Sequence, residues 1–351
     1  MAAGKNQHYV PQRYFRMFSE DGKSIRTLKL SDGSIIPSAS IKGQSSKAWF
    51  YGTSDVEERL AQLENLTGKS LREISTCTDT ASLSLDTLEH FRTWLAVQRT
   101  RTESSRQASK GTDTNLTKLW LEAAINSNAE IDEARREDLL SVLPMVETVD
   151  STFQLQRMAI AAEHSYKLAD LDIVLVKNLS GKPFIFGDAP CIYCNPLRQD
   201  INYKGVLGMS SLGLIIAFPL NHQLMALLYD GLVYNVRKPS TGIRTTNLAS
   251  DITSLNKLQF HAASSCIYYS NARHDSYISY LWNLEKNNFT GKNYINVETE
   301  PVAKGDGTTS SIFHIYEPQL PVRLNLSFLS IKNRPFPEEI DTRDEYRYYI
   351  R

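Results

Sequence analysis

The sequence has few cysteines and no long hydrophobic run. Its four cysteines are too few and too irregularly spaced for the disulfide framework of a secreted protein. Its longest apolar stretches, such as residues 213–220, are much shorter than the roughly 20 residues that span a bilayer. The opening residues lack the apolar core of a secretory signal. These absences predict a cytoplasmic protein with no membrane partner.

The composition also lacks an excess of either charge. Lys and Arg number 39, as do Asp and Glu, so the formal net charge is zero and the pI is near 7.1. Strong sequence-independent binding to nucleic acid needs a basic surface, so only a local basic patch is compatible with this balance. The hydrophobic fraction of 41% and the charged fraction of 22% are typical of a packed globular protein.

Common catalytic signatures are missing as well. The chain contains no GxxxxGK[ST], GxGxxG, HExxH or GxSxG motif, which argues against nucleotide-dependent enzymes and the commonest hydrolases. Cys191 and Cys194 form a CxxC pair, but no second pair with zinc-ligand spacing accompanies it. We therefore predict that this pair binds no metal.

Hydrophobic periodicity divides the chain into an N-terminal hairpin and a helical block. The Asp32-Gly33 turn, between β-prone runs at 25–30 and 35–38, predicts an antiparallel hairpin. Residues 53–169 have the apolar spacing of helices. Within this block, helices are expected near residues 54–74, 87–107, 114–127, 131–143 and 147–169.

From about residue 170 the pattern changes to short apolar runs that are typical of strands, and 322–329 is one such run. Helices near 247–264 and 273–285 interrupt the strands. Because strands and helices are segregated along the chain, we predict an α+β fold with a mixed, largely antiparallel sheet. Without repeats or linkers, residues 1–351 should form a single composite domain, in which residues 1–52 pack on the sheet-containing part at 170–351.

The N-terminal string HYVPQRYF presents a histidine in an unusual setting. Pro11 biases Val10 toward extended geometry and keeps His8 off a helix. A histidine on an irregular segment can act as a general acid or base, because its unperturbed pKa is near neutral. The alternative is that His8 hydrogen-bonds a backbone carbonyl and only anchors the N-terminus.

The helix expected from residue 87 carries two polar residues where its apolar stripe predicts core. Gln98 falls near the middle of the stripe and Arg101 at its edge. Buried, they would need partners, and an arginine can bind a phosphate bidentately. The alternative is that the stripe ends at Ala96 and the helix continues into solvent. Arg92, Arg99 and Arg106 recur every seven residues, as an anion-binding stripe or as a solvated face.

Asp188 follows the apolar run 184–187 and precedes a turn. Acidic residues at strand ends serve as metal ligands or orient a catalytic histidine. The alternative is that such a residue forms an ordinary turn by accepting backbone hydrogen bonds.

These features coincide with a family pattern. The sequence resembles a bacterial domain-of-unknown-function family whose members open with HYVPQ, followed by an aromatic and basic stretch that ends in Phe. Residues 8–12 and 13–18 match this opening, and the resemblance spans roughly residues 6 to 271. The other matching segments are Phe50-Tyr51 ahead of Val56-Glu57-Glu58, Gln98 with Arg101-Thr102, Gly187-Asp188-Ala189-Pro190, Phe218-Pro219-Leu220, and Asn256 with Ile267-Tyr268-Tyr269.

The resemblance implies a bacterial protein and, for some members, association with anti-phage defence loci. It supplies no mechanism, fold or cofactor. The chain departs from the pattern at Glu103, where the family usually has proline after Arg-Thr, so we expect the helix that carries Arg101 to continue. The polar positions that match the family motifs are His8, Gln12, Gln98, Arg101, Asp188 and Asn256.

The leading hypothesis is a bacterial anti-phage defence effector with phosphodiesterase or nuclease chemistry. His8 would be the general acid or base, and Asp188 would orient it or hold a metal. One alternative is a non-catalytic sensor that binds a phage component; another is a hydrolase of nucleotides or other phosphoesters. The expected partners are nucleic acid or a phage protein. Convergence of the candidate residues in one cleft would favour a functional site. The substrate-binding residues of this hypothesis are Gln12, Gln98, Arg101 and Asn256.

Overall fold

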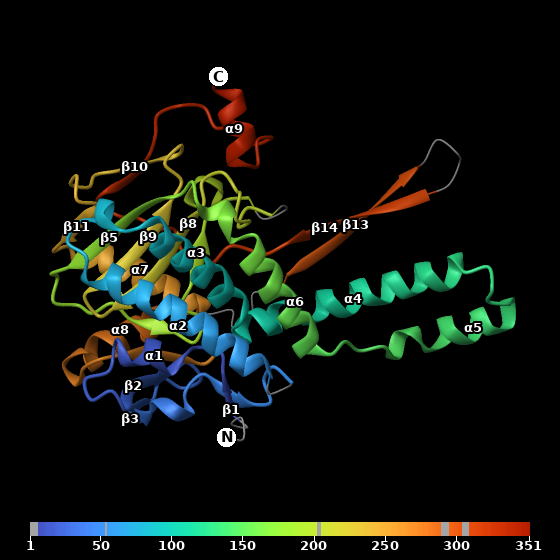
Figure 1. Ribbon diagram of the computed structural model, residues 1–351, viewed down its shortest axis with the longest axis horizontal. Coiled ribbons are helices and arrows are strands. Elements are labelled where there is room, and N and C mark those ends of the chain that lie inside the picture. Colours follow the sequence, from blue (N-terminus) through green and yellow to red (C-terminus); the bar gives the residue numbers. More distant parts are fainter. Residues whose placement is uncertain (1–5, 53–54, 202–204, 289–294, 304–308) are drawn as a thin grey trace.

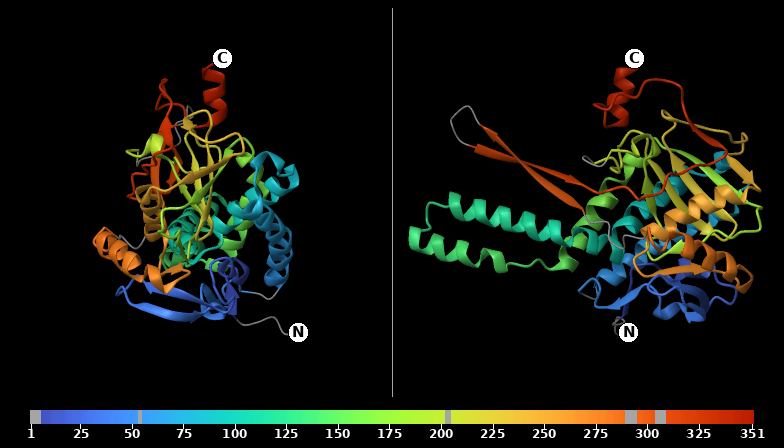
Figure 2. Two further views of the ribbon diagram at one scale, coloured as in Figure 1. Left: turned by 90° about the vertical axis from the view of Figure 1, so that its left-hand side faces the viewer. Right: turned by 180° about the vertical axis from the view of Figure 1, so that it is seen from behind.

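The protein consists of a body built on two sheets, from which two long arms project on the same side (Figures 1 and 2). The computed structural model describes residues 6–52, 55–201, 205–288, 295–303 and 309–351. Within these residues, helices and strands form a mixed but mostly antiparallel arrangement. The predicted α+β class is therefore confirmed.

The larger sheet has five strands, and its residues alternate between two apolar layers. On its fourth strand, Ile216 and Phe218 face one core cluster, whereas Ile215 and Ala217 face the other. The first two strands run parallel and the remaining neighbours run antiparallel. In spatial order the strands are β11 (Ile243–Thr246), β5 (Asp172–Asn178), β9 (Leu224–Tyr229), β8 (Ile215–Asn221) and β7 (Ile192–Cys194).

Helices cover both faces of this sheet (Figure 2). On one face lie α2 (Asp55–Thr76), α3 (Leu85–Thr100) and α6 (Asp150–Glu163), which contribute Leu71, Trp94 and Met158 to the first core cluster. On the other lies α7 (Ala249–Ala262), which contributes Ile252, Leu255 and Leu258 to the second. Between residues 55 and 168, helices dominate as the sequence predicts.

The smaller sheet contains the N-terminal hairpin. β3 (Ile35–Ser40) and β2 (Ser24–Lys29) form the expected hairpin, which continues through β12 (Cys266–Tyr269) to β6 (Phe186–Gly187). α8 (Asp275–Glu285) packs on this sheet through Ile278 and Leu281. Residues 24–40 are thus hydrogen-bonded into the sheet-containing part, a closer association than packing on its surface.

An aromatic cluster joins the two sheets. The short helix α1 (Gln12–Arg16) buries Tyr14 and Phe15, and their rings contact Phe186 with centroids 4.9 Å and 5.1 Å apart. Tyr14 also contacts Phe218 of β8, and Phe15 contacts Tyr268 of β12. The aromatic N-terminal segment is therefore part of the core, because it fills the space between the sheets.

The remaining elements lie at the edges of the body or form the arms (Figure 1). One arm is the helical pair α4 (Glu103–Ser127) and α5 (Glu133–Val142), and the other is the hairpin β13 (Asn296–Ala303) and β14 (Thr309–Tyr316). No described helix is long and apolar enough to cross a membrane. At the edges are two strand pairs and the last helix: β1 (Asn6–His8) with β4 (Ser46–Ala48), β10 (Tyr234–Val236) with β15 (Leu329–Ile331), and α9 (Arg343–Tyr349).

The expected helix 87–107 is wrong in one respect: it breaks at residues 101 and 102. Thr102 has an extended backbone, with φ −84° and ψ 160°, and its side chain accepts a hydrogen bond from the Ser105 N–H. Thr102 thereby caps α4, and Glu103 occupies the first helical position, where an acidic residue is favourable. Proline is also favoured at that position. Replacing the family's proline with Glu103 therefore leaves the break in place.

A second difference concerns residues 322–329, which were expected to form a strand. Only Leu329 belongs to one, in β15. Val322, Leu326 and Phe328 nevertheless pack into the cluster under α7, so the apolar pattern reflects burial of an irregular segment. A short apolar run shows that a segment is buried without specifying its backbone.

Arg101 is 1% exposed, and its guanidinium donates to the Tyr51 hydroxyl, the Glu64 carboxylate and a backbone carbonyl of β1. We predict that Arg101→Ala destabilises the protein by about 3 kcal/mol, because it removes this buried charge and leaves those partners unpaired. The matched control is Arg59→Ala on the exposed side of α2, which should change stability by less than about 0.5 kcal/mol. Urea unfolding of both variants measures the difference. Equal midpoints for the two variants would contradict a structural role for Arg101.

Candidate functional site

His8 ends β1, and its side chain is half-buried. Its Nε2 lies 3.2 Å from the carbonyl oxygen of Lys42. Burial lowers the pKa of the imidazole, and the hydrogen bond to Lys42 partly offsets this effect. The side chain is thus mostly neutral at pH 7, and its observed contact is the backbone carbonyl that the anchoring alternative expected.

Gln98 and Arg101 hold the segment that follows His8. Gln98 Nε2 donates to the Tyr9 carbonyl at 3.0 Å, and Arg101 Nη2 donates to the His8 carbonyl at 2.8 Å. Arg101 is 1% exposed and also donates to the Tyr51 hydroxyl and the Glu64 carboxylate. Both residues are buried, so the alternative of a solvated helix end is wrong. Their donors are occupied by protein.

Asp188 lies at the end of β6 and is buried. Its carboxylate accepts four hydrogen bonds of 2.5 to 2.9 Å, from the backbone N–H and the hydroxyl of both Ser264 and Ser265. Burial raises the pKa of the Asp188 carboxyl, and these four donors partly offset the rise. The carboxylate is therefore saturated by the loop before β12.

Asn256 likewise binds backbone. Its amide accepts from the Ile185 N–H at 3.2 Å and donates to the Pro183 carbonyl at 2.8 Å. One turn later on α7, Gln259 accepts from Gly187 N–H and donates to the Pro190 carbonyl. The two amides fix the segment around β6 against α7, which is a structural use of both side chains.

The structure brings His8, Gln98 and Arg101 together around the N-terminal segment. Asp188 belongs to the neighbouring loop, and it adds to the rise that burial causes in the pKa of Tyr9. Gln12 is half-buried and accepts a hydrogen bond from Arg16, within its own helix. The observed contacts thus form separate networks around backbone segments, without one shared cleft.

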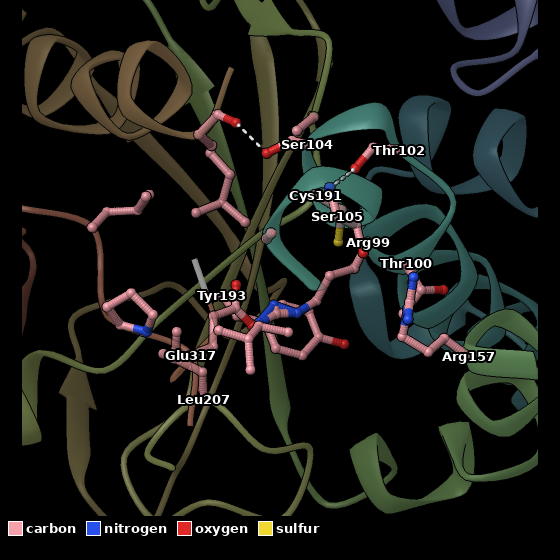
Figure 3. Close-up of a pocket in the computed structure, with 17 residues that line it drawn as sticks. Arg99, Thr100, Thr102, Ser104, Ser105, Arg157, Cys191, Tyr193, Leu207 and Glu317 are labelled. Atoms are coloured by element: carbon pink, nitrogen blue, oxygen red, sulfur yellow. Dashed lines mark hydrogen bonds and ion pairs between the residues drawn. The ribbon is translucent and has the colours of Figure 1, made fainter. Parts of the chain in front are cut away.

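A pocket of about 170 Å³ lies where both arms join the body (Figure 3). We call it the root pocket. One wall is the last turn of α3 and the first turns of α4, another is β7, and a third is the chain that enters and leaves the β13–β14 hairpin. Its main lining residues are Arg99, Thr102, Ser104, Ser105, Arg157, Cys191, Tyr193, Leu207, Ile295, Glu317, Pro318 and Leu320.

Two arginines give the root pocket a cationic side. Arg99 lies over the Tyr193 ring, 4.1 Å from its centroid, and is paired with Glu317. Burial would lower the pKa of Arg99, but the Glu317 carboxylate holds it above its usual value, so the guanidinium is charged. Arg157 donates through Nη1 to Asp113 at 2.6 Å, whereas its Nε and Nη2 are buried and have no hydrogen-bond partner.

The pocket also receives the N-terminus of α4, a helix of 25 residues. Backbone N–H groups at the start of a helix favour anions. Tyr193 also lines the pocket and is only 3% exposed. Its hydroxyl is buried and has no hydrogen-bond partner. Unsatisfied buried donors are costly, so a site that retains several is suited to an acceptor that is bound from outside.

Cys191 faces the same pocket, but burial raises the pKa of its thiol to about 12, so it is protonated at neutral pH and unreactive. Cys194 is buried in the other core cluster. Among the described residues, no group of three or more His, Cys, Asp and Glu side chains gathers to hold a metal ion.

Comparison with known families matches residues 6–273 to a family described as Protein of unknown function (DUF4238). The chain belongs to this family. The match covers most of the chain, from β1 to the residues just before α8, and includes every residue that the sequence analysis selected. No curated protein and no solved structure matches the chain.

The region that matches the DUF4238 family contains only some of the residues that line the root pocket. Arg99, Arg157 and Tyr193 lie inside the matched region, whereas Glu317 lies beyond it. Sequence reasoning selected Arg99 only as one of three arginines spaced by seven, and it missed the other three residues. They come from distant segments and belong to no motif, so the sequence held no local signal for them.

We predict that Tyr193→Phe leaves the free energy of unfolding unchanged or raises it by up to about 1 kcal/mol, because the hydroxyl it removes is buried without a partner. The matched control is Tyr234→Phe. The Tyr234 hydroxyl donates to the Gly213 carbonyl at 2.7 Å and accepts from the Leu197 N–H. That variant should lose about 1 to 2 kcal/mol. Equal losses in urea unfolding would mean that the Tyr193 hydroxyl is already satisfied.

Proposed function

We propose that this protein is a sensor in bacterial anti-phage defence that binds a phosphate-bearing ligand in the root pocket. The observation that carries the proposal is the set of unsatisfied donors there: Nε and Nη2 of Arg157, and the Tyr193 hydroxyl. The defence context rests on the family resemblance. The ligand class rests on the chemistry of the pocket.

Arg157 has the geometry that a phosphate requires. Nε and Nη2 lie on the same edge of the guanidinium and donate in parallel, which matches two oxygens of one phosphate. Asp113 engages only the remaining nitrogen, Nη1, and holds the side chain in place. The start of α4 and the charged Arg99 add positive potential in the same pocket.

The size and lining of the pocket limit the ligand. A volume of about 170 Å³ is below the roughly 300 Å³ at which drug-sized sites begin, so it holds a phosphate and the group attached to it. Leu207, Pro318 and Leu320 provide an apolar surface beside the polar wall. A phosphate monoester such as a mononucleotide fits this combination, with its base extending out of the pocket.

A polynucleotide fits less well, because the helical arm beside the pocket is acidic. Acidic residues outnumber basic ones between residues 113 and 147. A polyanion lying along α4 and α5 would be repelled by this charge. The ligand we propose is therefore small, and the phage-derived or defence-derived signal is a nucleotide rather than a nucleic acid strand.

Recognition without hydrolysis also follows from the groups that line the pocket. The Cys191 thiol is protonated at neutral pH, and burial raises the pKa of the Tyr193 hydroxyl, so neither is an activated nucleophile. His8 does not line the pocket. These points favour the sensor alternative over the hydrolase alternatives.

We predict that wild-type protein binds adenosine monophosphate and that Arg157→Ala weakens this binding at least about tenfold, the effect of losing a charge-assisted hydrogen bond. Isothermal titration calorimetry measures both affinities. The matched control is Arg92→Ala, a half-buried arginine of α3 that lies outside the pocket, and it should bind like wild type. Absence of binding by wild type, or unchanged binding by Arg157→Ala, would reject the site.

The second candidate function is a phosphodiesterase that uses His8. The observation in its favour is that burial lowers the pKa of this imidazole, so at neutral pH it is in the unprotonated form that a general base requires. Asp188 is saturated by four hydrogen bonds, so in this candidate it would only support the fold around the site.

For this candidate, His8→Ala should lower cleavage of labelled RNA by about 100-fold to 10,000-fold, the usual contribution of general acid or base catalysis. His90→Ala, on α3, is the matched control and should retain the activity. Melting temperatures of both variants separate catalysis from anchoring. Retained cleavage, or a loss that accompanies a large drop in melting temperature, would remove His8 from the chemistry.

A further inference from the structure

Glu317 occupies a position in the root pocket that an anionic ligand would otherwise take. Its carboxylate pairs with Arg99, and its side chain is 40% exposed. It directly follows β14, so it is the first residue of the chain after the hairpin arm. In Figure 3, Glu317 lies next to Tyr193 and Arg99 at one side of the pocket.

A phosphate that extends from Arg157 to Arg99 would meet the Glu317 carboxylate, which pairs with Arg99. Like charges at short range in a partly buried site repel strongly, because the effective dielectric constant is lower than that of water. The two anions would therefore compete for Arg99. A dianionic phosphate has the advantage, since it carries more charge and can accept from both arginines and from Tyr193.

We infer that Glu317 is an internal competitor that occupies Arg99 until a phosphate-bearing ligand displaces it. The inference rests on the proposed function. It adds that Glu317 controls the affinity of the root pocket for its ligand and selects ligands by their charge. A monoanion such as acetate would bind Arg99 no more strongly than the Glu317 carboxylate already does, so it would not displace Glu317. The site thereby selects dianionic phosphates over carboxylates.

Displacement of Glu317 also changes the hairpin arm. The wall of the pocket includes Ile295, just before β13, and Glu317, just after β14, so both ends of the hairpin meet at the site. Ile295 is held to α4, since its N–H donates to the Ala108 carbonyl and its carbonyl accepts from the Thr112 hydroxyl. The Arg99–Glu317 pair holds the other end. Breaking that pair leaves this end held from Gln319 onward, which accepts from the Asn195 N–H and donates to the Arg198 carbonyl.

This arrangement gives ligand binding a structural output. A two-stranded hairpin has little stability of its own. The protection of its backbone N–H groups from hydrogen exchange therefore depends on how its two ends are held. Release of Glu317 should therefore raise hydrogen exchange in β13 and β14. Glu317 lies beyond the region that matches the DUF4238 family, so the competitor and the arm belong to the part of this chain outside that match.

The test uses Glu317→Gln in the full chain, which keeps the shape of the side chain and removes its charge. We expect this variant to bind adenosine monophosphate and inorganic phosphate about tenfold more tightly than wild type, because no carboxylate must be displaced. Hydrogen exchange in β14 should be raised in the variant without ligand, and raised in wild type only when adenosine monophosphate is added.

Glu300→Gln is the matched control, since Glu300 pairs with His314 within the same hairpin and lies outside the pocket. It should bind like wild type. If wild type binds and Arg157→Ala does not, but Glu317→Gln binds no more tightly, the competitor is rejected and the proposed function stands. Binding by Glu317→Gln alone would overturn displacement by the ligand, because adenosine monophosphate would then fail to reach the wild-type site. If neither wild type nor Glu317→Gln binds, both ideas are overturned.

Discussion

The rest of the structure depends on satisfying the buried charge of Arg101. A guanidinium that is 1% exposed must have its donors paired, and its partners come from β1, α2 and the loop before α2. These partners bring the N-terminal segment against the end of α3. With that segment fixed, Tyr14 and Phe15 fill the space between the two sheets. The contacts of Arg101 thus hold in place the segment that supplies the central aromatic cluster.

The same position sets the geometry of the root pocket. Arg101 directs its side chain into the body at the end of α3, and Thr102 then starts a new helix in a different direction. The first turn of α4 therefore faces Arg99 of the preceding turn across the pocket. A continuous helix over these residues would pair the Ser104 N–H internally, whereas at the break Thr102 caps only the Ser105 N–H. The break leaves helix N-terminal donors available at the site.

The sequence predicted which residues are buried better than it predicted what they do. Periodicity put Gln98 within the apolar stripe and Arg101 at its edge, with a solvated helix end as the alternative, and Asp32-Gly33 located the hairpin, because both signals are local. The helix break was missed, since Thr102 as a cap competes with a helical pattern that is otherwise continuous. The four donors around Asp188 were also missed, because Ser264 and Ser265 lie 76 and 77 residues away in sequence. Site geometry of this kind arises only from the tertiary fold.

Polar residues in this chain therefore fall into two physical groups. Arg101, Asp188 and Asn256 have nearly all of their hydrogen-bonding groups paired with the protein, and removal of one would leave several partners unsatisfied. Tyr193 is buried and the Arg157 side chain is 23% exposed, yet each keeps a buried donor without a partner. Burial of such donors costs free energy that the folded protein does not recover by itself. Unpaired buried donors also occur outside the pocket, at Trp94, Arg136 and Arg244. The root pocket differs because two residues with such donors, Arg157 and Tyr193, line one cavity, and this coincidence supports the proposed site.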